Sequence, residues 1–139
     1  MKFNTKTRYG LRTMIELAMH FKNGPFFQKD IALNQELSDK YLDHIIADLK
    51  KAGLVKNAGG KKSGYVLTRE PNKIFVYDIF IAFNSNKINV DCVDADEHCN
   101  RKKSCAANEF WIDLNNYVCT YLKSISLEKL VKKQHILNQ

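Results

Sequence analysis

The segment from Ser38 to Gly53 limits the possible folds most, because it carries a full set of helix start and stop signals. Ser38 is a natural N-cap, Leu37 and Leu42 occupy the two positions of a hydrophobic staple, and Gly53 follows the last turn. The apolar stripe falls at helical spacing and consists of Leu42, Ile45, Ile46 and Leu49. We therefore predict a helix with one buried face and one face free to approach another surface.

Two helices are predicted before this segment and a hairpin after it. Apolar side chains recur at helical spacing over residues 7–21, and a shorter helix is predicted over 28–34. After Gly53 the pattern becomes extended, with strands predicted over 54–56 and 65–67 and a glycine-rich tip over 59–64. This order predicts a mostly α fold with a small β-wing. It is a winged helix-turn-helix, in which the capped helix enters the major groove and the wing follows the DNA backbone.

The positive charge of the chain lies mostly in the same half. The chain has 22 basic and 15 acidic residues, a net charge of +7, and residues 1–70 hold 13 basic and 7 acidic residues, a net charge of +6. Residues 49–69 contain six basic residues and no acidic one. Such a block is expected of a phosphate-backbone binder, because each neutralised phosphate releases counterions. On charge alone, a solvated basic face is an equally good interpretation.

The size of the chain excludes several classes of protein. With 139 residues there is room for one domain and a short extension, which excludes a barrel enzyme. No apolar run reaches the roughly 18 residues of a membrane-spanning helix, and the first residues lack the apolar segment of a secretory signal. We therefore expect a cytoplasmic protein without a membrane partner. We also expect no enzymatic activity, because we find no Ser/His/Asp arrangement and no phosphate-cradling motif.

The residue pattern from Pro71 onward indicates that the second half of the chain has a different role from the first. We expect residues 1–70 to form the DNA-binding domain and residues 71–139 a dimerisation region. This region has a short apolar helix over 74–83, an aperiodic loop over 84–107 and a long helix over 108–124. The long helix has a broad apolar face made of Phe110, Trp111, Leu114, Tyr117, Val118, Tyr121 and Leu122, with Ile125 just beyond. Because so small a domain cannot cover it, we predict a dimerisation helix; packing against residues 74–83 is the alternative.

Three of the four cysteines, Cys92, Cys99 and Cys105, lie in the predicted loop. In a cytoplasmic chain, clustered thiols are more often metal ligands or redox groups than structural bridges. Thiolates are soft ligands that suit iron, while a structural zinc site and thiol oxidation remain open alternatives. Cys119 lies within the long apolar helix, where we favour core packing over ligation.

Several segments of the chain together resemble the Rrf2 family of bacterial winged-helix regulators. They are residues 5–12 (TKTRYGLR), 38–42 (SDKYL), 49–55 (LKKAGLV) and 64–67 (GYVL), followed by the three cysteines, 111–114 (WIDL) and 124–127 (SISL). The resemblance is to the cysteine-containing, IscR- and NsrR-like branch. It implies a homodimeric transcription factor, a repressor in our hypothesis, that binds a double-stranded DNA operator. It also implies an iron–sulfur cluster, 2Fe–2S or 4Fe–4S, on Cys92, Cys99 and Cys105, so that operator binding follows redox, nitric oxide or iron–sulfur status.

The chain departs from this family pattern at several positions. Six residues separate the first two cysteines, one more than usual, and Asn108 replaces the histidine that completes the ligand set in the IscR-like branch. Arg8 stands where some members have an acidic ligand, and Gly59 stands where many have a wing arginine. The fourth ligand stays open among His98, Asp94, Asp96, Glu97, Glu109, a partner-chain residue and water. A cysteine-metabolism branch of the family lacks the cysteines and works through an enzyme partner.

Nine residues are candidates for contact with DNA. The candidates for base edges or phosphates are Ser38, Lys40, Tyr41, Asp43 and His44. The candidates for contacts that position the DNA backbone are Lys6, Gln28, Lys61 and Lys62. Asp43 would accept a hydrogen bond from cytosine or repel phosphates, and each of the nine has the alternative of being ordinary surface.

Two rival functions remain at this point. One is a winged-helix regulator with zinc or no metal, controlled by thiol oxidation or by a partner protein. The other is a small iron–sulfur redox protein, which would leave the capped helix and the acid-free basic stretch unexplained.

Overall fold

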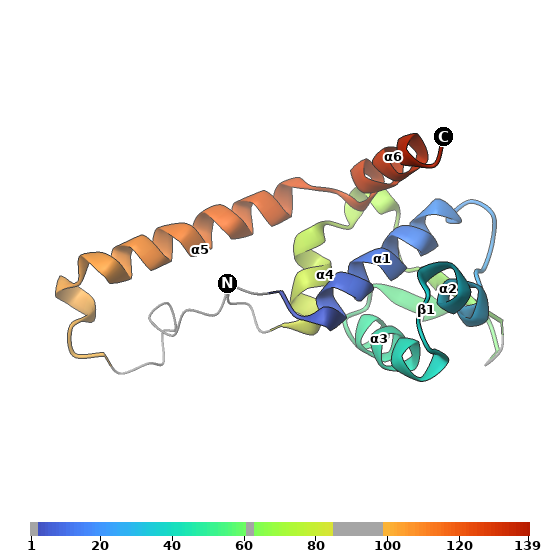
Figure 1. The fold of residues 1–139 in the computed structure, drawn as a ribbon, viewed down its shortest axis with the longest axis horizontal. Helices are drawn as coiled ribbons and strands as arrows, with labels where there is room; N and C mark the ends of the chain where they lie inside the picture. Colours follow the sequence, from blue (N-terminus) through green and yellow to red (C-terminus); the bar gives the residue numbers. More distant parts are fainter. Residues whose placement is uncertain (1–2, 61–62, 85–98) are drawn as a thin grey trace.

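The computed structural model describes residues 3–60, 63–84 and 99–139, and its elements follow the predicted order (Figure 1). The helices are α1 (Thr5–Met19), α2 (Gln28–Gln35), α3 (Asp39–Lys51), α4 (Val76–Phe83), α5 (Ala106–Ser124) and α6 (Leu127–Leu137). The remaining elements are β1 (Val55–Asn57), β2 (Tyr65–Leu67) and the short 3₁₀ helices η1 (Pro71–Lys73) and η3 (Lys102–Ser104). The prediction of a mostly α, winged helix-turn-helix fold with a long late helix is confirmed.

Helix α3 forms for the reasons that its sequence indicates. The Ser38 side chain accepts a hydrogen bond from the Tyr41 backbone N–H at 3.1 Å, and Gly53 adopts a left-handed φ of 75° just past the end. The four predicted stripe residues are all buried against α1 and α2: Leu42, Ile45, Ile46 and Leu49. Burying this one stripe fixes which face of α3 stays open.

The two strands form the predicted wing hairpin, which is joined to the start of α2. Val55 pairs with Leu67 and Asn57 with Tyr65 in an antiparallel register. The first strand begins one residue later than predicted because the Leu54 N–H bonds the Leu49 carbonyl and so belongs to the end of α3. Tyr65 also exchanges two backbone hydrogen bonds with Phe26, at 2.9 and 3.1 Å. The wing is therefore fixed to the turn that precedes α2.

The hydrophobic core continues beyond Pro71. Ile74, Ile79 and Leu127 are fully or almost fully buried in the same cluster as the residues of α1 and α3. Ile74 and Phe75 are extended, the Ile74 carbonyl accepts from the Leu127 N–H, and the Val76 N–H donates to the Ile125 carbonyl, so α4 starts only at Val76. Helix α6, which we did not predict, begins at a Ser126 N-cap and packs against α1. The division into residues 1–70 and 71–139 stays a prediction.

Helix α5 extends away from the other helices and packs against them only near its C-terminal end (Figure 1). There Leu122, Val118 and Cys119 pack around Phe80 of α4, as the alternative interpretation expected for the whole helix. Beside these residues, Tyr117 and Tyr121 are 77% and 65% exposed. Phe110, Tyr117 and Tyr121 of the broad apolar face are thus uncovered in a single chain, while its other residues are half-buried or buried.

Among the described residues, no helix combines the length and the apolar character that crossing a membrane requires.

Candidate functional site

The open face of α3 carries most of the predicted DNA-contacting residues. Lys40, Asp43 and His44 are exposed on it, as predicted. Ser38 is exposed at its start, and because the oxygen of its hydroxyl caps the helix, the hydroxyl hydrogen remains to donate to another group. The face therefore presents a cation, a carboxylate, an imidazole and a hydroxyl within about two helical turns.

Tyr41 lies at the edge of this face rather than on it. Its ring is half-buried against the main core and meets the Tyr9 ring edge to face, with the centroids 5.9 Å apart. Tyr41 precedes Ile45 by one helical turn, so its position borders the buried stripe. The sequence analysis named Tyr41 as a DNA-contacting candidate and did not predict this half-burial; the contact itself stays a prediction.

Lys6 is paired with an acidic residue of α3. Its ammonium nitrogen lies 3.2 Å from Asp48 Oδ2, and both side chains are partly exposed. An exposed pair of this kind is worth about 0–1 kcal/mol, so little opposes a turn of Lys6 toward a phosphate. The pair joins the first turn of α1 to α3.

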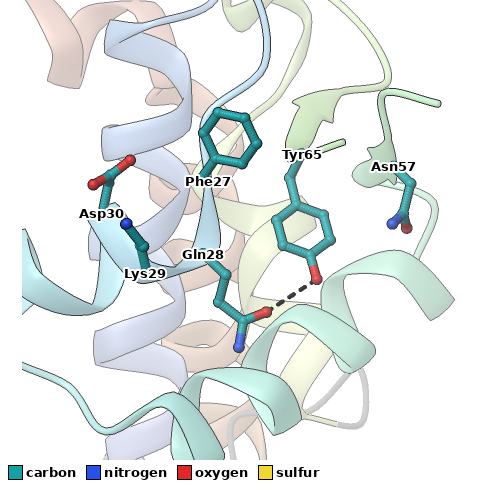
Figure 2. A pocket seen from close by; sticks show the side chains of 7 residues that line it. Phe27, Gln28, Lys29, Asp30, Asn57 and Tyr65 are labelled. Carbon is teal, nitrogen blue, oxygen red and sulfur yellow. Dashed lines mark hydrogen bonds between the residues drawn. The ribbon is translucent and has the colours of Figure 1, made fainter. Parts of the chain in front are cut away.

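Gln28 lies at the centre of a hydrogen-bond network that joins α2, α3 and the wing. Its Oε1 accepts from the Tyr65 hydroxyl at 3.0 Å (Figure 2). Its Nε2 donates to Asp43 Oδ1 at 2.5 Å and to the Asp39 carbonyl at 3.3 Å. Burial, and to a lesser degree the Asp43 charge, raises the pKa of Tyr65 above its ordinary value. The sequence analysis did not find Tyr65, which no local motif marks.

An open hollow of about 660 Å³ lies between the start of α2 and the wing. Phe27, Lys29, Asn57 and Tyr65 are among the residues that line it (Figure 2). No side chain caps α2; the N–H groups of Asp30 and Ile31 bond the Phe27 carbonyl, which leaves those of Gln28 and Lys29 for another acceptor. A helix start of this kind beside a lysine suits a backbone phosphate.

The wing tip is only partly described. Lys61 and Lys62 lie outside the described residues, so their predicted phosphate contacts stay predictions. Beside them, the Ser63 hydroxyl donates to the Gly60 carbonyl at 2.6 Å and accepts from the Gly59 N–H at 2.7 Å. Ser63 therefore closes the base of the tip.

The predicted cysteine site is described only at its C-terminal side. Cys92 lies outside the described residues, together with His98, Asp94, Asp96 and Glu97. Cys99 is exposed, Cys105 is half-buried, and both are free thiols on either side of η3. Cys105 is the N-cap residue of α5, and Asn108 in the first turn is buried. Within the described ranges, no three His, Cys, Asp or Glu side chains are grouped as a metal site requires.

Asn84, the last residue described before the cysteine segment, is fixed to the start of α1. Its Nδ2 donates to Thr7 Oγ1 at 2.8 Å and to the Phe80 carbonyl at 2.9 Å. Its Oδ1 accepts from Asn4, whose own Oδ1 caps α1 through the Thr7 N–H. The start of the segment and the Lys6–Asp48 pair therefore share the first turn of α1.

Comparisons with known proteins give matches along nearly the whole chain. A family model described as Rrf2, iron-dependent transcriptional regulator, matches residues 3–133. The chain is 34% identical over 138 residues to the HTH-type transcriptional regulator IscR of Xenorhabdus nematophila, which covers 99% of this chain and 84% of IscR.

Two solved structures are similar in fold. The structure of T. potens IscR has a TM-score of 0.77 at 35% identity and covers 96% of this chain and 88% of that one. The structure of CymR, the global cysteine regulator of B. subtilis, has a TM-score of 0.77 at 37% identity and covers 96% and 98%. The similarity is thus equally close to an IscR and to a CymR.

Proposed function

The chain belongs to the Rrf2 family of transcriptional regulators, and we propose that it is a homodimeric repressor in the cytoplasm that binds a double-stranded DNA operator through α3 and the wing. We further propose that an iron–sulfur cluster on Cys92, Cys99 and Cys105 controls this binding. The observation that carries the proposal is the exposed polar face of α3, which lies beside the uncapped start of α2 and the wing.

In the proposed complex, α3 lies in the major groove. Lys40, Asp43 and His44 face the base edges, because they are exposed on the side opposite the buried stripe. The DNA backbone on one side of the groove meets the start of α2 and Lys29. On the other side of the groove, Lys6 leaves Asp48 and binds a DNA phosphate. Lys61 and Lys62 would add the wing contact.

The apolar face of α5 supports the proposed homodimer. Phe110, Tyr117 and Tyr121 are more than half exposed in a single chain, and large aromatic residues are enriched in the cores of protein interfaces. Two copies joined through α5 would carry two α3 helices, which matches a palindromic operator with half-sites one helical turn apart.

The residues present fit an iron–sulfur cluster in donor chemistry. Cys99 and Cys105 are free thiols near the start of the 19-residue helix α5, and thiolates are soft ligands that suit iron. Glu109, exposed in the first turn of α5, is the described candidate for a fourth ligand. When bound, the cluster would supply a group that reacts to oxidants and to nitric oxide.

The proposed control acts through residues 84–107. Two arrangements of this segment would hold α5, and therefore the two copies of α3, at different separations. Asn84 and α5 are the two ends of the segment that the structure ties to the rest of the chain. A chemical state of the cysteines that favours neither arrangement would leave their populations, and therefore operator binding, unchanged.

The alternative function is a regulator with zinc or no metal, controlled by thiol oxidation or by a partner protein. The observation that favours it is the similarity to the structure of CymR, titled a global cysteine regulator, at 37% identity.

Titration of DNA binding with salt tests the operator-binding proposal. We expect affinity for selected duplexes to fall steeply with salt, and Lys62→Ala to reduce the slope by about one unit. Lys132→Ala on α6 is the control and should leave the slope unchanged, because α6 lies away from α3 (Figure 1). A protein that selects no DNA sequence would contradict the proposal.

Anaerobic purification tests the cofactor. We expect visible charge-transfer absorption with bound iron and sulfide, lost in Cys99→Ser and Cys105→Ser and kept in the control Cys119→Ser, which packs against α4. Colourless protein with stoichiometric zinc would exclude the cluster and leave DNA binding intact.

A further inference from the structure

We infer that Gln28 is a specificity-determining residue that does not itself read DNA: it holds one carboxylate oxygen of Asp43, so that the other oxygen selects cytosine at one position of each half-site. The inference rests on the proposed DNA binding and adds to it a named base and the residues that orient its reader.

The direction of the Gln28 amide follows from its neighbours. Asp43 Oδ1 and the Asp39 carbonyl oxygen only accept hydrogen bonds, so the amide nitrogen must face them. The amide oxygen then faces the Tyr65 hydroxyl, which must donate. The reverse orientation would place three acceptors together without a proton between them. The network thus runs in one direction, from the Tyr65 hydroxyl through Gln28 to Asp43.

This network leaves Asp43 with one oxygen for DNA. Oδ1 is occupied by the Gln28 Nε2 at 2.5 Å, while no hydrogen bond to Oδ2 is found among the described residues. Because the Gln28 amide restrains the side chain, Oδ2 has a preferred direction on the exposed face of α3. An aspartate without this restraint would rotate and accept from whichever donor lies nearest.

The base follows from the donors in the major groove. Only cytosine N4 and adenine N6 offer an N–H there, whereas guanine and thymine present acceptors that repel a carboxylate. Adenine also presents the N7 acceptor beside its amino group, and cytosine does not. A carboxylate oxygen with a fixed direction therefore prefers cytosine over the other three bases.

The same network sets the position of the wing relative to α3. Tyr65 is in β2, directly after the wing tip, and its backbone is bonded to Phe26 just before α2. Lys50 of α3 lies 5.6 Å from the centre of the Tyr65 ring. Gln28 is thus held from the wing side while it holds Asp43, so it acts on DNA through another residue.

Selection from a randomised duplex library, followed by titration of every single-base variant of the selected site, tests the inference. We expect the full-length wild-type protein to prefer cytosine at one position per half-site by about tenfold. Gln28→Leu should reduce that preference to less than about threefold and leave the other positions and the salt slope unchanged. Gln28→Glu should reduce the preference as much, with an added loss of affinity that is equal at all positions, because its charge lies at the start of α2 where we place a phosphate. Gln28→Glu still accepts from Tyr65 but repels Asp43, so it separates the orientation of Asp43 from the attachment of the wing.

Three further variants complete the test. Asp43→Ala should remove the cytosine preference at the same base position. Adding Gln28→Leu to Asp43→Ala should change the base preferences no further, because both residues act through one contact. Tyr65→Phe should reduce the preference by about two- to threefold. Gln134→Leu, the same chemical change on α6, should leave every preference unchanged; this side chain bonds Asn138 on its own helix.

The outcomes separate the two proposals. If the wild-type protein selects no sequence, the proposed function is wrong and this inference fails with it. If the wild-type protein selects a site but Gln28→Leu keeps the same base preferences, or loses affinity equally at all positions with a lower salt slope, only the inference is wrong. If Gln28→Leu does not fold, as judged by circular dichroism, Gln28→Glu and Tyr65→Phe decide the question.

Discussion

Replacing Gly10 with alanine tests the contact that positions α4, and with it the start of the cysteine segment, against α1. Gly10 is buried in α1 and faces the ring of Phe83 at the end of α4. A Cβ at position 10 would lie 2.2 Å from Phe83 Cε2 and 2.5 Å from Cζ. Carbon atoms prefer separations of about 3.5–4.0 Å, so the ring must move by more than about 1 Å. Asn84 follows Phe83 directly and would move with it.

Two opposing effects set the size of the change. Overpacking a closed contact costs about 1–3 kcal/mol. Alanine is better than glycine inside a helix by about 0.5–1 kcal/mol, which offsets part of that cost. We therefore expect Gly10→Ala to lower the free energy of unfolding by about 0.5–2 kcal/mol.

Urea unfolding followed by circular dichroism measures this change, at one protein concentration because self-association also stabilises the fold. Phe83→Leu removes the obstructing ring atoms, so the double variant should be more stable than the sum of the two single changes predicts, by about 0.5 kcal/mol or more. Gly60→Ala is the control: a Cβ there meets nothing within 4 Å, and the change should stay within about 0.5 kcal/mol. Full stability of Gly10→Ala, or additive effects of the two changes, would refute the argument.

Three further predictions concern α3, α5 and the wing. Ser38→Ala should lower the unfolding free energy by about 1 kcal/mol and Ser38→Thr by much less, because only the hydroxyl caps α3; equal losses in urea unfolding would contradict the capping role. Tyr117→Glu should weaken self-association by about tenfold or more in sedimentation experiments, whereas Asn116→Glu, on the opposite side of α5, should not; equal effects would argue against this face. The raised pKa of Tyr65 means that the stability it contributes is present below about pH 10 and is lost as the pH rises through that raised value. The unfolding free energy should therefore fall more between about pH 9 and about pH 11 in the wild-type protein than in Tyr65→Phe, and identical profiles would exclude the effect.

The sequence predicted α3 well because its signals are local. The Ser38 cap, the stripe from Leu42 to Leu49 and the glycine after the last turn all lie within one short segment, and each acts on its near neighbours. The wing and α2 were predicted on the same grounds. The half-burial of Tyr41 was not predicted, because its contact with Tyr9 joins two different helices.

The features that the sequence did not reveal depend on residues far apart in the chain. Gln28 meets Asp43 across 15 residues and Tyr65 across 37. The pairing of residues 74–76 with 125–127, which sets the start of α4 and brings α6 onto α1, joins residues about 50 positions apart. Hydrophobic periodicity carries no information about such pairs, because it reports only which side of an element is buried. Charge counts likewise did not show that Lys6 is paired with Asp48.

Two routes connect the cysteine segment to α3, and their energies differ. The first runs from Asn84 through Asn4 and Thr7 to the Lys6–Asp48 pair. A partly exposed ion pair is worth about 0–1 kcal/mol, so this route alone can change DNA affinity by no more than about fivefold.

The second route runs through the packing of α5 on α4, where Leu122 and Phe80 are buried against each other. Burying one such side chain is worth about 1.5–3 kcal/mol, and a shift of α5 in a homodimer would act on both half-sites at once. A regulator of this architecture that changes operator affinity by more than about tenfold must therefore do so through α5 rather than through the first turn of α1.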